Sequence, residues 1–182
     1  MKVYLIGFMG CGKSTLGQKV AKILGIDFID TDKIITKESN LSIKSIFEEL
    51  GEAAFRSLEA DIINKIGEKV YTKDVIISTG GGLPCEENNI KVIKNTGLSI
   101  YLKLNTDILE RRLKYGKDKR PIISLTTDEN LNYTINDLLQ KRSYYYEKAD
   151  EIIICNQMSD KEIIDKIISL IENYKSNNTN KI

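Results

Sequence analysis

The sequence is distinguished first by what it lacks: its 182 residues include no histidine, no tryptophan and only two prolines. Without histidine, no imidazole can act as general base, metal ligand or phosphoryl carrier, so any proton transfer must fall to another side chain. The three cysteines, Cys11, Cys85 and Cys155, lie far apart and form no C-x-x-C pair. An odd number without metal-like spacing indicates reduced thiols in a cytoplasmic protein.

An excess of one charge and long apolar runs are also missing. The 27 Lys and Arg residues oppose 26 Asp and Glu residues, for a formal net charge of +1. That balance argues against a dedicated nucleic-acid-binding protein. No run approaches the roughly 20 apolar residues that span a membrane, and the apolar start, Val3 to Ile6, is too short for a signal peptide. We therefore expect a soluble, cytoplasmic protein without a nucleic-acid or membrane partner.

What the sequence does contain is a regular alternation of short apolar runs and longer helical patterns. The expected strands are residues 3–6, 28–29, 75–78, 98–104 and 151–155. The expected helices are residues 13–24, 42–50, 52–66, 86–94, 106–113, 128–148 and 160–174. This alternation predicts a single α/β domain in which a five-stranded parallel sheet is flanked by helices.

The length suits one domain, which we expect to cover residues 1–174 and to be followed by a polar, frayed tail at 175–182. One segment, residues 114–127, breaks the pattern because it is charged and contains Gly116 and Pro121. Long irregular segments are uncommon in compact domains, and many of them are lids. We therefore expect a mobile lid at this position.

A phosphate-binding loop follows the first expected strand. Residues Gly7 to Ser14, read as G-F-M-G-C-G-K-S, match the pattern G-x-x-x-x-G-K-[ST]. The glycines let backbone N–H groups converge on an anion, and the following helix adds the partial positive charge of its N-terminus. Lys13 can reach the β and γ phosphates, and the hydroxyl of Ser14 can ligate Mg²⁺. Its position between a strand and a helix argues against a chance match, so the loop predicts nucleoside triphosphate binding.

The remaining sequence narrows the class of P-loop protein. GTPases usually carry an N-K-x-D stretch that reads guanine, and this sequence has none. Motor ATPases are generally longer. The chain length therefore favours a small kinase that phosphorylates a second substrate directly.

Two carboxylates follow the second expected strand, in Asp30-Thr31-Asp32. On an extended strand end, residues i and i+2 point the same way, toward the carboxyl edge of the sheet where ligands of open α/β sheets bind. One carboxylate could hold Mg²⁺ through its water shell, and the other could orient or deprotonate an attacking hydroxyl. The alternative is an N-cap pair for the next helix.

Two further features lie beyond these carboxylates. Phe55-Arg56 occurs in an expected helix, and Gly80-Gly81-Gly82 follows the third expected strand. Three glycines at a strand end remove side chains where a ligand can approach the backbone. The alternatives are a bare turn for the glycines and a solvated charge for Arg56.

Taken together, these motifs resemble the shikimate kinase family. The resemblance covers about residues 1–172 and rests on the order of the whole set. The set consists of the phosphate loop with Thr15, Asp30-Thr31-Asp32, Phe55-Arg56, Ser78-Thr79-Gly80-Gly81-Gly82, Arg120-Pro121, and Arg142 with Tyr146. The resemblance implies a P-loop kinase fold with a mobile lid. It also implies ATP-dependent phosphorylation of the 3-hydroxyl of shikimate, a step toward chorismate and the aromatic amino acids.

The resemblance also implies roles for individual residues. Asp32 is the candidate general base and contacts the shikimate hydroxyls, while Arg56 and Arg142 bind the shikimate carboxylate. The glycine turn, Gly80, Gly81 and Gly82, lines the same pocket. Ser14 binds Mg²⁺, with Asp30 holding the ion through water, and Arg120 reaches over the ATP phosphates and acts together with Lys13. The expected ATP-binding residues are Gly10, Cys11, Gly12, Lys13, Ser14, Thr15, Arg112, Arg120 and Met158.

The sequence departs from the family pattern in two places. Tyr144 stands where the family often has a proline between Arg142 and Tyr146, and this leaves Lys141 as a minor alternative to Arg142. Residues 156–160 lack the arginine and proline that often line the adenine. Met158 and Arg112 are therefore the expected side-chain contacts to the base, with a plain surface arginine as the alternative for Arg112.

Two other functions remain open on the sequence. The nearer alternative is another small P-loop kinase, acting on gluconate or a nucleoside monophosphate. The other is a binding or regulatory domain that kept the fold without catalysis, although Lys13, Ser14, Asp30, Asp32 and Arg120 are all present. We expect a monomer, as is common in the family.

Overall fold

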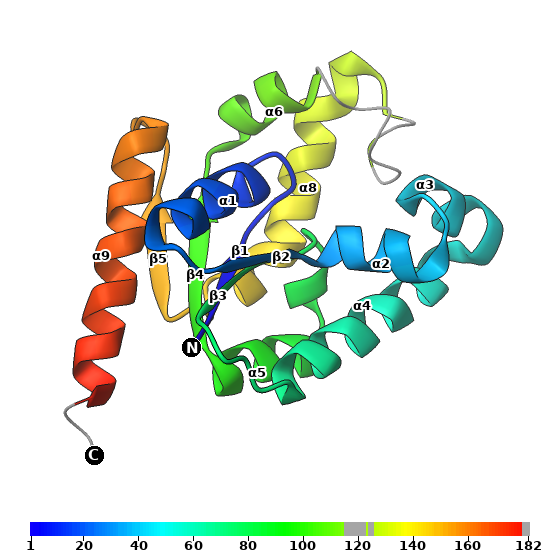
Figure 1. Ribbon diagram of the computed structural model, residues 1–182. Coiled ribbons are helices and arrows are strands. Elements are labelled where there is room, and N and C mark those ends of the chain that lie inside the picture. The colour runs from blue at the N-terminus through cyan, green and yellow to red at the C-terminus, as the bar shows by residue number, and fades with distance from the viewer. Residues whose placement is uncertain (115–122, 124–125, 180–182) are drawn as a thin grey trace.

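The computed structural model describes residues 1–114, 123 and 126–179 (Figure 1). Five strands form one sheet: β1 (Lys2–Ile6), β2 (Asp27–Asp30), β3 (Val75–Ser78), β4 (Leu98–Lys103) and β5 (Glu151–Ile154). They lie in the order β2-β3-β1-β4-β5, and each neighbouring pair is parallel. The predicted five-stranded parallel sheet is therefore confirmed.

Helices connect the strands and cover both faces of the sheet. They are α1 (Lys13–Leu24), α2 (Thr31–Ser39), α3 (Ile43–Ser45), α4 (Gly51–Glu68), α5 (Glu87–Thr96), α6 (Thr106–Lys114), α8 (Asp128–Tyr146) and α9 (Asp160–Thr179). A π-helical turn, η1 (Ile46–Leu50), precedes α4, and a 3-10 turn, η2 (Leu83–Cys85), follows β3. Among the described residues, no helix is both long and apolar enough to span a membrane.

The central strand β1 shows how the layers form. Neighbouring strand residues face opposite sides of a sheet, and Tyr4 and Leu5 contact different helices. The hydroxyl of Tyr4 shares a 2.7 Å hydrogen bond with Thr96 at the end of α5. On the other face, α1 approaches so closely that a Cβ atom at Gly17 would lie 3.0 Å from Leu5 Cδ1. Helix α9 lies beside α1 (Figure 1), so α1 with α9 and α5 cover opposite faces.

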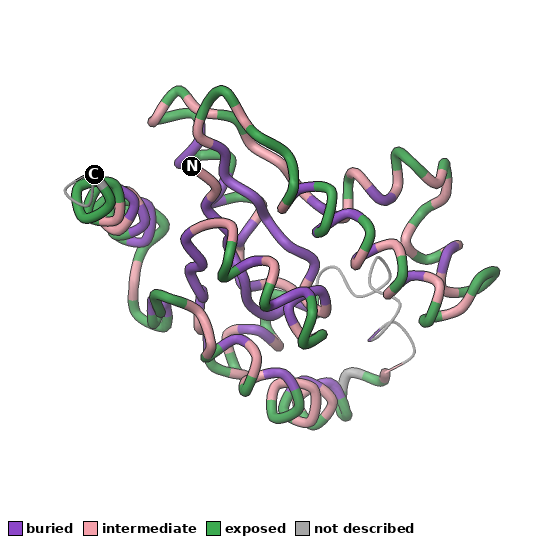
Figure 2. The backbone as a smooth tube through the Cα atoms, turned by 90° about the horizontal axis from the view of Figure 1, so that it is seen from below, coloured by how far each residue is buried: buried purple, intermediate pink, exposed green. Residues whose placement is uncertain are grey.

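The middle of the sheet is buried on both faces, as Figure 2 shows. All four residues of β3 and residues 3–6 of β1 are buried, as expected for parallel strands covered by helices on both sides. The carboxyl ends of parallel strands meet at one edge of the sheet. That edge places the start of the phosphate loop, Asp30 and the glycine turn next to one another.

Several expected elements agree with the structure, and one difference bears directly on the site. The helix 13–24 and the strand 75–78 have the predicted bounds. Helix α2 was not predicted. Its presence shows that the expectation of an extended strand end shared by Asp30 and Asp32 was wrong. Asp32 lies in the first turn of α2, and the side chain of Asp30 caps that helix by accepting from Lys33 N at 3.3 Å. The β-branched composition of residues 31–36 hid this helix because it lowers helix propensity.

The ends of the long C-terminal helices also differ from the prediction. Helix α8 ends at Tyr146, before the expected Lys148. Helix α9 continues to Thr179, past the expected end at Tyr174, so residues 175–179 are helical. Most of the predicted lid, including Arg120, lies outside the described residues.

Candidate active site

The chain turns from β1 into α1 through the phosphate loop. Gly10 and Gly12 have φ angles of +82° and +104°, a backbone region that other residues rarely adopt. Lys13 opens α1, and its Nζ donates to the carbonyl oxygens of Gly7 at 2.8 Å and Phe8 at 3.0 Å. The ammonium group therefore lies against the loop, at a helix N-terminus whose N–H groups favour an anion.

The hydroxyl at the end of the loop lies beside a carboxylate. Ser14 Oγ donates to Asp30 Oδ2 at 2.6 Å and lies 3.0 Å from Ser78 Oγ. A hydroxyl and a carboxylate are the hard donors that Mg²⁺ prefers, and Mg²⁺ usually keeps several waters and substrate oxygens. Within the described chain, no group of three or more acidic, Cys or His side chains could hold a metal alone. The donor set therefore fits an Mg²⁺ that is shared with phosphate oxygens and water.

A cavity of about 520 Å³ opens beside this loop, a size typical of small-ligand sites. Its walls come from the phosphate loop and from the carboxyl ends of β2 and β3, as the parallel sheet dictates. Of the predicted site residues, it is lined by Gly10, Gly12, Lys13, Ser14, Thr15, Asp30, Asp32, Gly81 and Arg112. The structure thus brings most of the predicted residues to one cavity.

The remaining predicted ATP-binding residues take different positions. Arg112, from α6, donates through Nη1 to the carbonyls of Gly10 and Cys11, both at 3.3 Å. The side chain of Cys11 is buried, and its Sγ lies 3.7 Å from Lys13 Nζ. Met158 is partly buried against the core and is not among the residues lining the cavity. Arg120 lies outside the described residues.

A buried polar cluster adjoins the cavity at the glycine turn. Three buried side-chain atoms have no hydrogen-bond partner among the described residues: Asp32 Oδ1, Glu59 Oε1 and Arg142 Nη1. A Cβ atom at Gly80 would lie 2.6 Å from Asp32 Oδ1 and 2.8 Å from Glu59 Oε1. Buried polar atoms are rarely left unpaired without a reason. The cluster therefore has the donors and acceptors to bind a small ligand with both hydroxyl and carboxylate groups.

Arg56 is fixed beside this cluster by two carboxylates of its own helix. Its Nη1 donates to Glu59 Oε2 at 2.5 Å, and its Nη2 donates to Glu52 Oε1 at 2.8 Å. Gly82 leaves room for the guanidinium, because a Cβ atom there would overlap it. Arg56 can thus present a fixed, planar donor to an anion.

Burial and neighbouring charges shift both carboxyl groups of the cluster toward their neutral forms. Burial raises the pKa of Asp32, and the charge of Asp30 raises it further, against the opposing effect of Lys13. Burial likewise raises the pKa of Glu59 to about 7, although Arg56 favours its ionised form. Raised carboxyl pKa values of this kind are common where proton transfer occurs.

Glu59 is a residue of the buried polar cluster that the sequence prediction missed. Its side chain is 1% exposed and occupies the face of α4 that otherwise buries Phe55, Ile62, Ile63 and Ile66. A carboxylate at a position where helical spacing predicts an apolar residue was the signal that could have found it.

The end of α8 contributes Arg142, which is 7% exposed, with its guanidinium carbon 5.6 Å from the centre of the Phe8 ring. The alternative residue, Lys141, points outward and pairs with Asp137 at 2.7 Å. One turn after Arg142, Tyr146 is buried and donates to the carbonyl of Gly81 at 2.5 Å. Of the two candidates for anion binding, Arg142 is the one that lies at the buried cluster.

The buried polar cluster of Asp32, Glu59 and Arg142 is hereafter called the acceptor cluster. Together with the parallel sheet and the phosphate loop after β1, it defines the chain as a P-loop kinase of the small, single-domain class. The model of the shikimate kinase family matches residues 9–172. The chain belongs to the shikimate kinase family.

Individual relatives agree with this assignment. The chain is 38% identical over 171 residues to a shikimate kinase of Flavobacterium johnsoniae, and these residues cover 93% of this chain and 98% of the relative. Its structure is similar to the shikimate kinase of Acinetobacter baumannii solved in complex with shikimate, with a TM-score of 0.86 and 32% identity, over 96% of this chain and 94% of the other. The shikimate kinase of Bacteroides thetaiotaomicron gives a TM-score of 0.84 and 34% identity, over 94% and 98%. The alternative of a gluconate or nucleoside monophosphate kinase is not favoured.

Proposed function

We propose that this chain transfers the γ-phosphoryl group of ATP to the 3-hydroxyl of shikimate, a step in aromatic amino acid biosynthesis. One observation carries the proposal. Lys13 and Ser14 of the phosphate loop line a cavity. The same cavity is lined by Asp32 of the acceptor cluster and by Gly81 of the glycine turn. A donor phosphate and an acceptor hydroxyl bound there would be neighbours, and such positioning supplies much of the catalysis in phosphoryl transfer.

The acceptor side of the mechanism rests on the buried cluster. Arg56 and Arg142 bind the shikimate carboxylate, since guanidinium groups form directed pairs with carboxylates. The unpartnered oxygen of Asp32 accepts a hydrogen bond from the reacting hydroxyl and takes up its proton as phosphoryl transfer proceeds. The turn Gly80-Gly81-Gly82 lets the substrate approach the backbone. Glu59 holds Arg56 in place through its 2.5 Å hydrogen bond.

The donor side uses the phosphate loop. Residues 10–15 bind the ATP phosphates, Lys13 stabilises the charge that develops on the transferred group, and Arg120 of the expected lid acts together with it. Ser14 would ligate Mg²⁺, with Asp30 holding the ion through water, and the bound ion would neutralise phosphate charge. Arg112 and Met158 contact the adenine. Every group in this scheme comes from one chain, so we also propose that the enzyme acts as a monomer. We further propose a cytoplasmic location, as expected from the sequence.

The experiment that tests this function measures ADP release from Mg·ATP with shikimate, gluconate or a nucleoside monophosphate as acceptor. We expect release that depends on shikimate and not on the other two acceptors. Equal release with all three, or release with none, would contradict the proposed function.

A further inference from the structure

Gly81 lies at the junction of the two halves of the site. On one side, a Cβ atom at Gly81 would lie 3.1 Å from Met9 N and 3.7 Å from Gly7 O, so its backbone rests directly on the phosphate loop. On the other side, Gly81 belongs to the turn that passes the acceptor cluster. The orientation of its peptide groups therefore sets how the acceptor pocket lies relative to the phosphate loop.

The carbonyl of Gly81 is held by a donor from a distant part of the chain. Tyr146 Oη donates to Gly81 O at 2.5 Å, and Cys85 Sγ makes a long contact of 3.8 Å to the same oxygen. Burial raises the pKa of Tyr146 well above its usual value, so its hydroxyl stays protonated and remains a donor. Tyr146 is therefore the strong donor to this oxygen.

This hydrogen bond also fixes the next peptide group. In a trans peptide plane, the carbonyl of Gly81 and the N–H of Gly82 point in opposite directions. A hydroxyl that holds the carbonyl thus directs the Gly82 N–H away from α8. No hydrogen bond from the N–H of Gly81 or Gly82 is found within the described part of the chain, which leaves both groups free to donate to a ligand.

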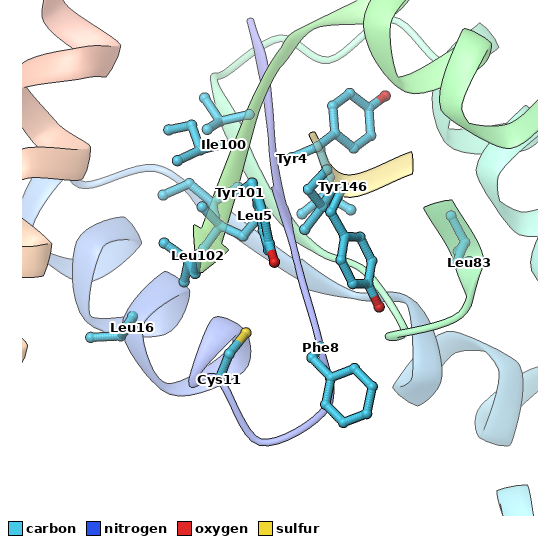
Figure 3. Close-up of a cluster of buried hydrophobic side chains, with 14 of the residues drawn as sticks. Tyr4, Leu5, Phe8, Cys11, Leu16, Leu83, Ile100, Tyr101, Leu102 and Tyr146 are labelled. Atoms are coloured by element: carbon cyan, nitrogen blue, oxygen red, sulfur yellow. The ribbon is translucent and has the colours of Figure 1, made fainter. Parts of the chain in front are cut away.

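The Tyr146 ring is itself rigidly supported. Figure 3 shows it in a cluster of buried hydrophobic side chains with Tyr101 and Phe8. The ring centres of Tyr146 and Tyr101 lie 5.1 Å apart. Tyr101 in turn packs on the start of the phosphate loop, since a Cβ atom at Gly7 would lie 3.3 Å from Tyr101 Cδ2. Residues i and i+4 share a helix face, so α8 presents Arg142 and Tyr146 together to the substrate side.

We propose that Tyr146 is a positioning residue for phosphoryl transfer: its hydroxyl fixes the Gly81–Gly82 peptide, so that the acceptor is held in register with the phosphate loop. The inference rests on the proposed function of the site. It predicts that loss of the hydroxyl alone disturbs acceptor use while leaving the nucleotide in place.

The test compares Tyr146→Phe with Tyr101→Phe, a matched control that removes the hydroxyl of the neighbouring buried tyrosine. In Tyr146→Phe we expect kcat/KM for shikimate to fall about tenfold, the effect of losing one well-formed hydrogen bond. The Kd for ATP should stay within about twofold of wild type, because the phosphate loop is untouched. In protein labelled with ¹⁵N-glycine, the Gly81 and Gly82 amide signals should move in Tyr146→Phe and stay in place in Tyr101→Phe. Unchanged amide signals, or wild-type kcat/KM, would overturn the proposal.

A second measurement does not depend on how well the phenylalanine variant folds. A single 3-fluorotyrosine at position 146 keeps both the ring and the hydroxyl, and its ¹⁹F signal should move when shikimate is added. If the ¹⁹F chemical shift of an active enzyme does not change when shikimate is added, the positioning role is overturned. If the wild-type protein fails to phosphorylate shikimate, the proposed function fails instead, and the amide comparison still decides whether Tyr146 orients the turn.

Discussion

Arg56 and Glu59 form a partly buried pair on one face of α4, in which Nη1 of the arginine lies 2.5 Å from Oε2 of the glutamate. The other oxygen of Glu59 is buried and has no hydrogen-bond partner in the described part of the chain. Glu59 therefore both fixes the direction of the guanidinium and faces the acceptor cluster. Replacing Glu59 therefore tests the role of the Arg56 position while Arg56 itself is kept.

At pH 8, where Glu59 with its pKa of about 7 is ionised, we expect Glu59→Gln to raise KM for shikimate. The ratio kcat/KM should fall by about tenfold or more, because a charge-assisted hydrogen bond to a buried partner is lost. The matched control is Glu52→Gln, which removes the other carboxylate that Arg56 contacts. The side chain of Glu52 is 62% exposed, and exposed ion pairs contribute little. Steady-state kinetics should show Glu52→Gln within about threefold of wild type. Equal effects of the two variants would contradict the assignment.

The raised pKa of Glu59 predicts a pH-dependent contribution to stability. A carboxyl group whose folded pKa of about 7 exceeds its usual 4.5 binds more protons in the folded state. Its contribution is therefore fully present below about pH 4.5 and is lost as the pH rises through 7. The free energy of unfolding, measured by urea titration at pH 5 and pH 8, should fall by roughly 1 kcal/mol or more relative to Glu59→Gln over that range. A difference that is independent of pH would show that Glu59 titrates normally.

Gly80→Ala should block the acceptor pocket. The added Cβ would lie 2.6 Å from Asp32 Oδ1 and 2.8 Å from Glu59 Oε1, so both carboxylates must move. We expect KM for shikimate to rise at least about tenfold, with little change in ATP affinity.

Gly67→Ala is the control for Gly80→Ala, because its Cβ would meet Val92 Cγ1 at 2.6 Å, far from the site. That variant should lose thermal stability, as overpacked sites do, and keep the wild-type KM. If both alanine variants keep the wild-type KM, Gly80 does not border the acceptor.

Asp30→Asn separates the metal role of Asp30 from its role in capping α2. Asparagine caps a helix about as well as aspartate, so the thermal midpoint should change little. Loss of the negative charge beside Ser14 should raise the free Mg²⁺ needed for half-maximal rate by about 10-fold or more, as for other outer-sphere ligands of metals. A titration of Mg²⁺ at fixed ATP measures this, and an unchanged midpoint would argue against Asp30 as a metal-site residue.

The parts of the site that the sequence predicts are those whose chemistry is local. The phosphate loop is contiguous, and its position between β1 and α1 follows from the pattern of apolar residues. The approach of Glu59 to Gly80 and the Tyr146–Gly81 hydrogen bond could not be read from the sequence, since each joins residues far apart in the chain, 65 positions in the second case. These contacts depend on how α4 and α8 pack against the sheet, which the order of residues leaves open.

Helix α2 shows a second kind of limit. Asp30 is at once the last residue of β2, the cap of α2 and a partner of Ser14. The prediction weighed metal binding against capping. The structure shows the cap through Oδ1 and a hydrogen bond from Ser14 to Oδ2. Asp32 lies in the first turn of this helix and not on the predicted extended strand end. Its side chain still lines the cavity because the helix begins at the carboxyl edge of the sheet.

We propose that Asp32 activates the shikimate hydroxyl for attack on ATP, and ³¹P NMR of the reaction mixture measures this step most directly. With wild-type enzyme, Mg·ATP and shikimate, we expect a new phosphate monoester signal as ADP forms. Asp32→Asn should lower that rate about 100-fold or more, while Asp27→Asn, at the exposed start of β2, should react like wild type. A wild-type protein that binds ATP without forming the shikimate phosphate ester, or an Asp32→Asn variant that forms it at the normal rate, would contradict the account.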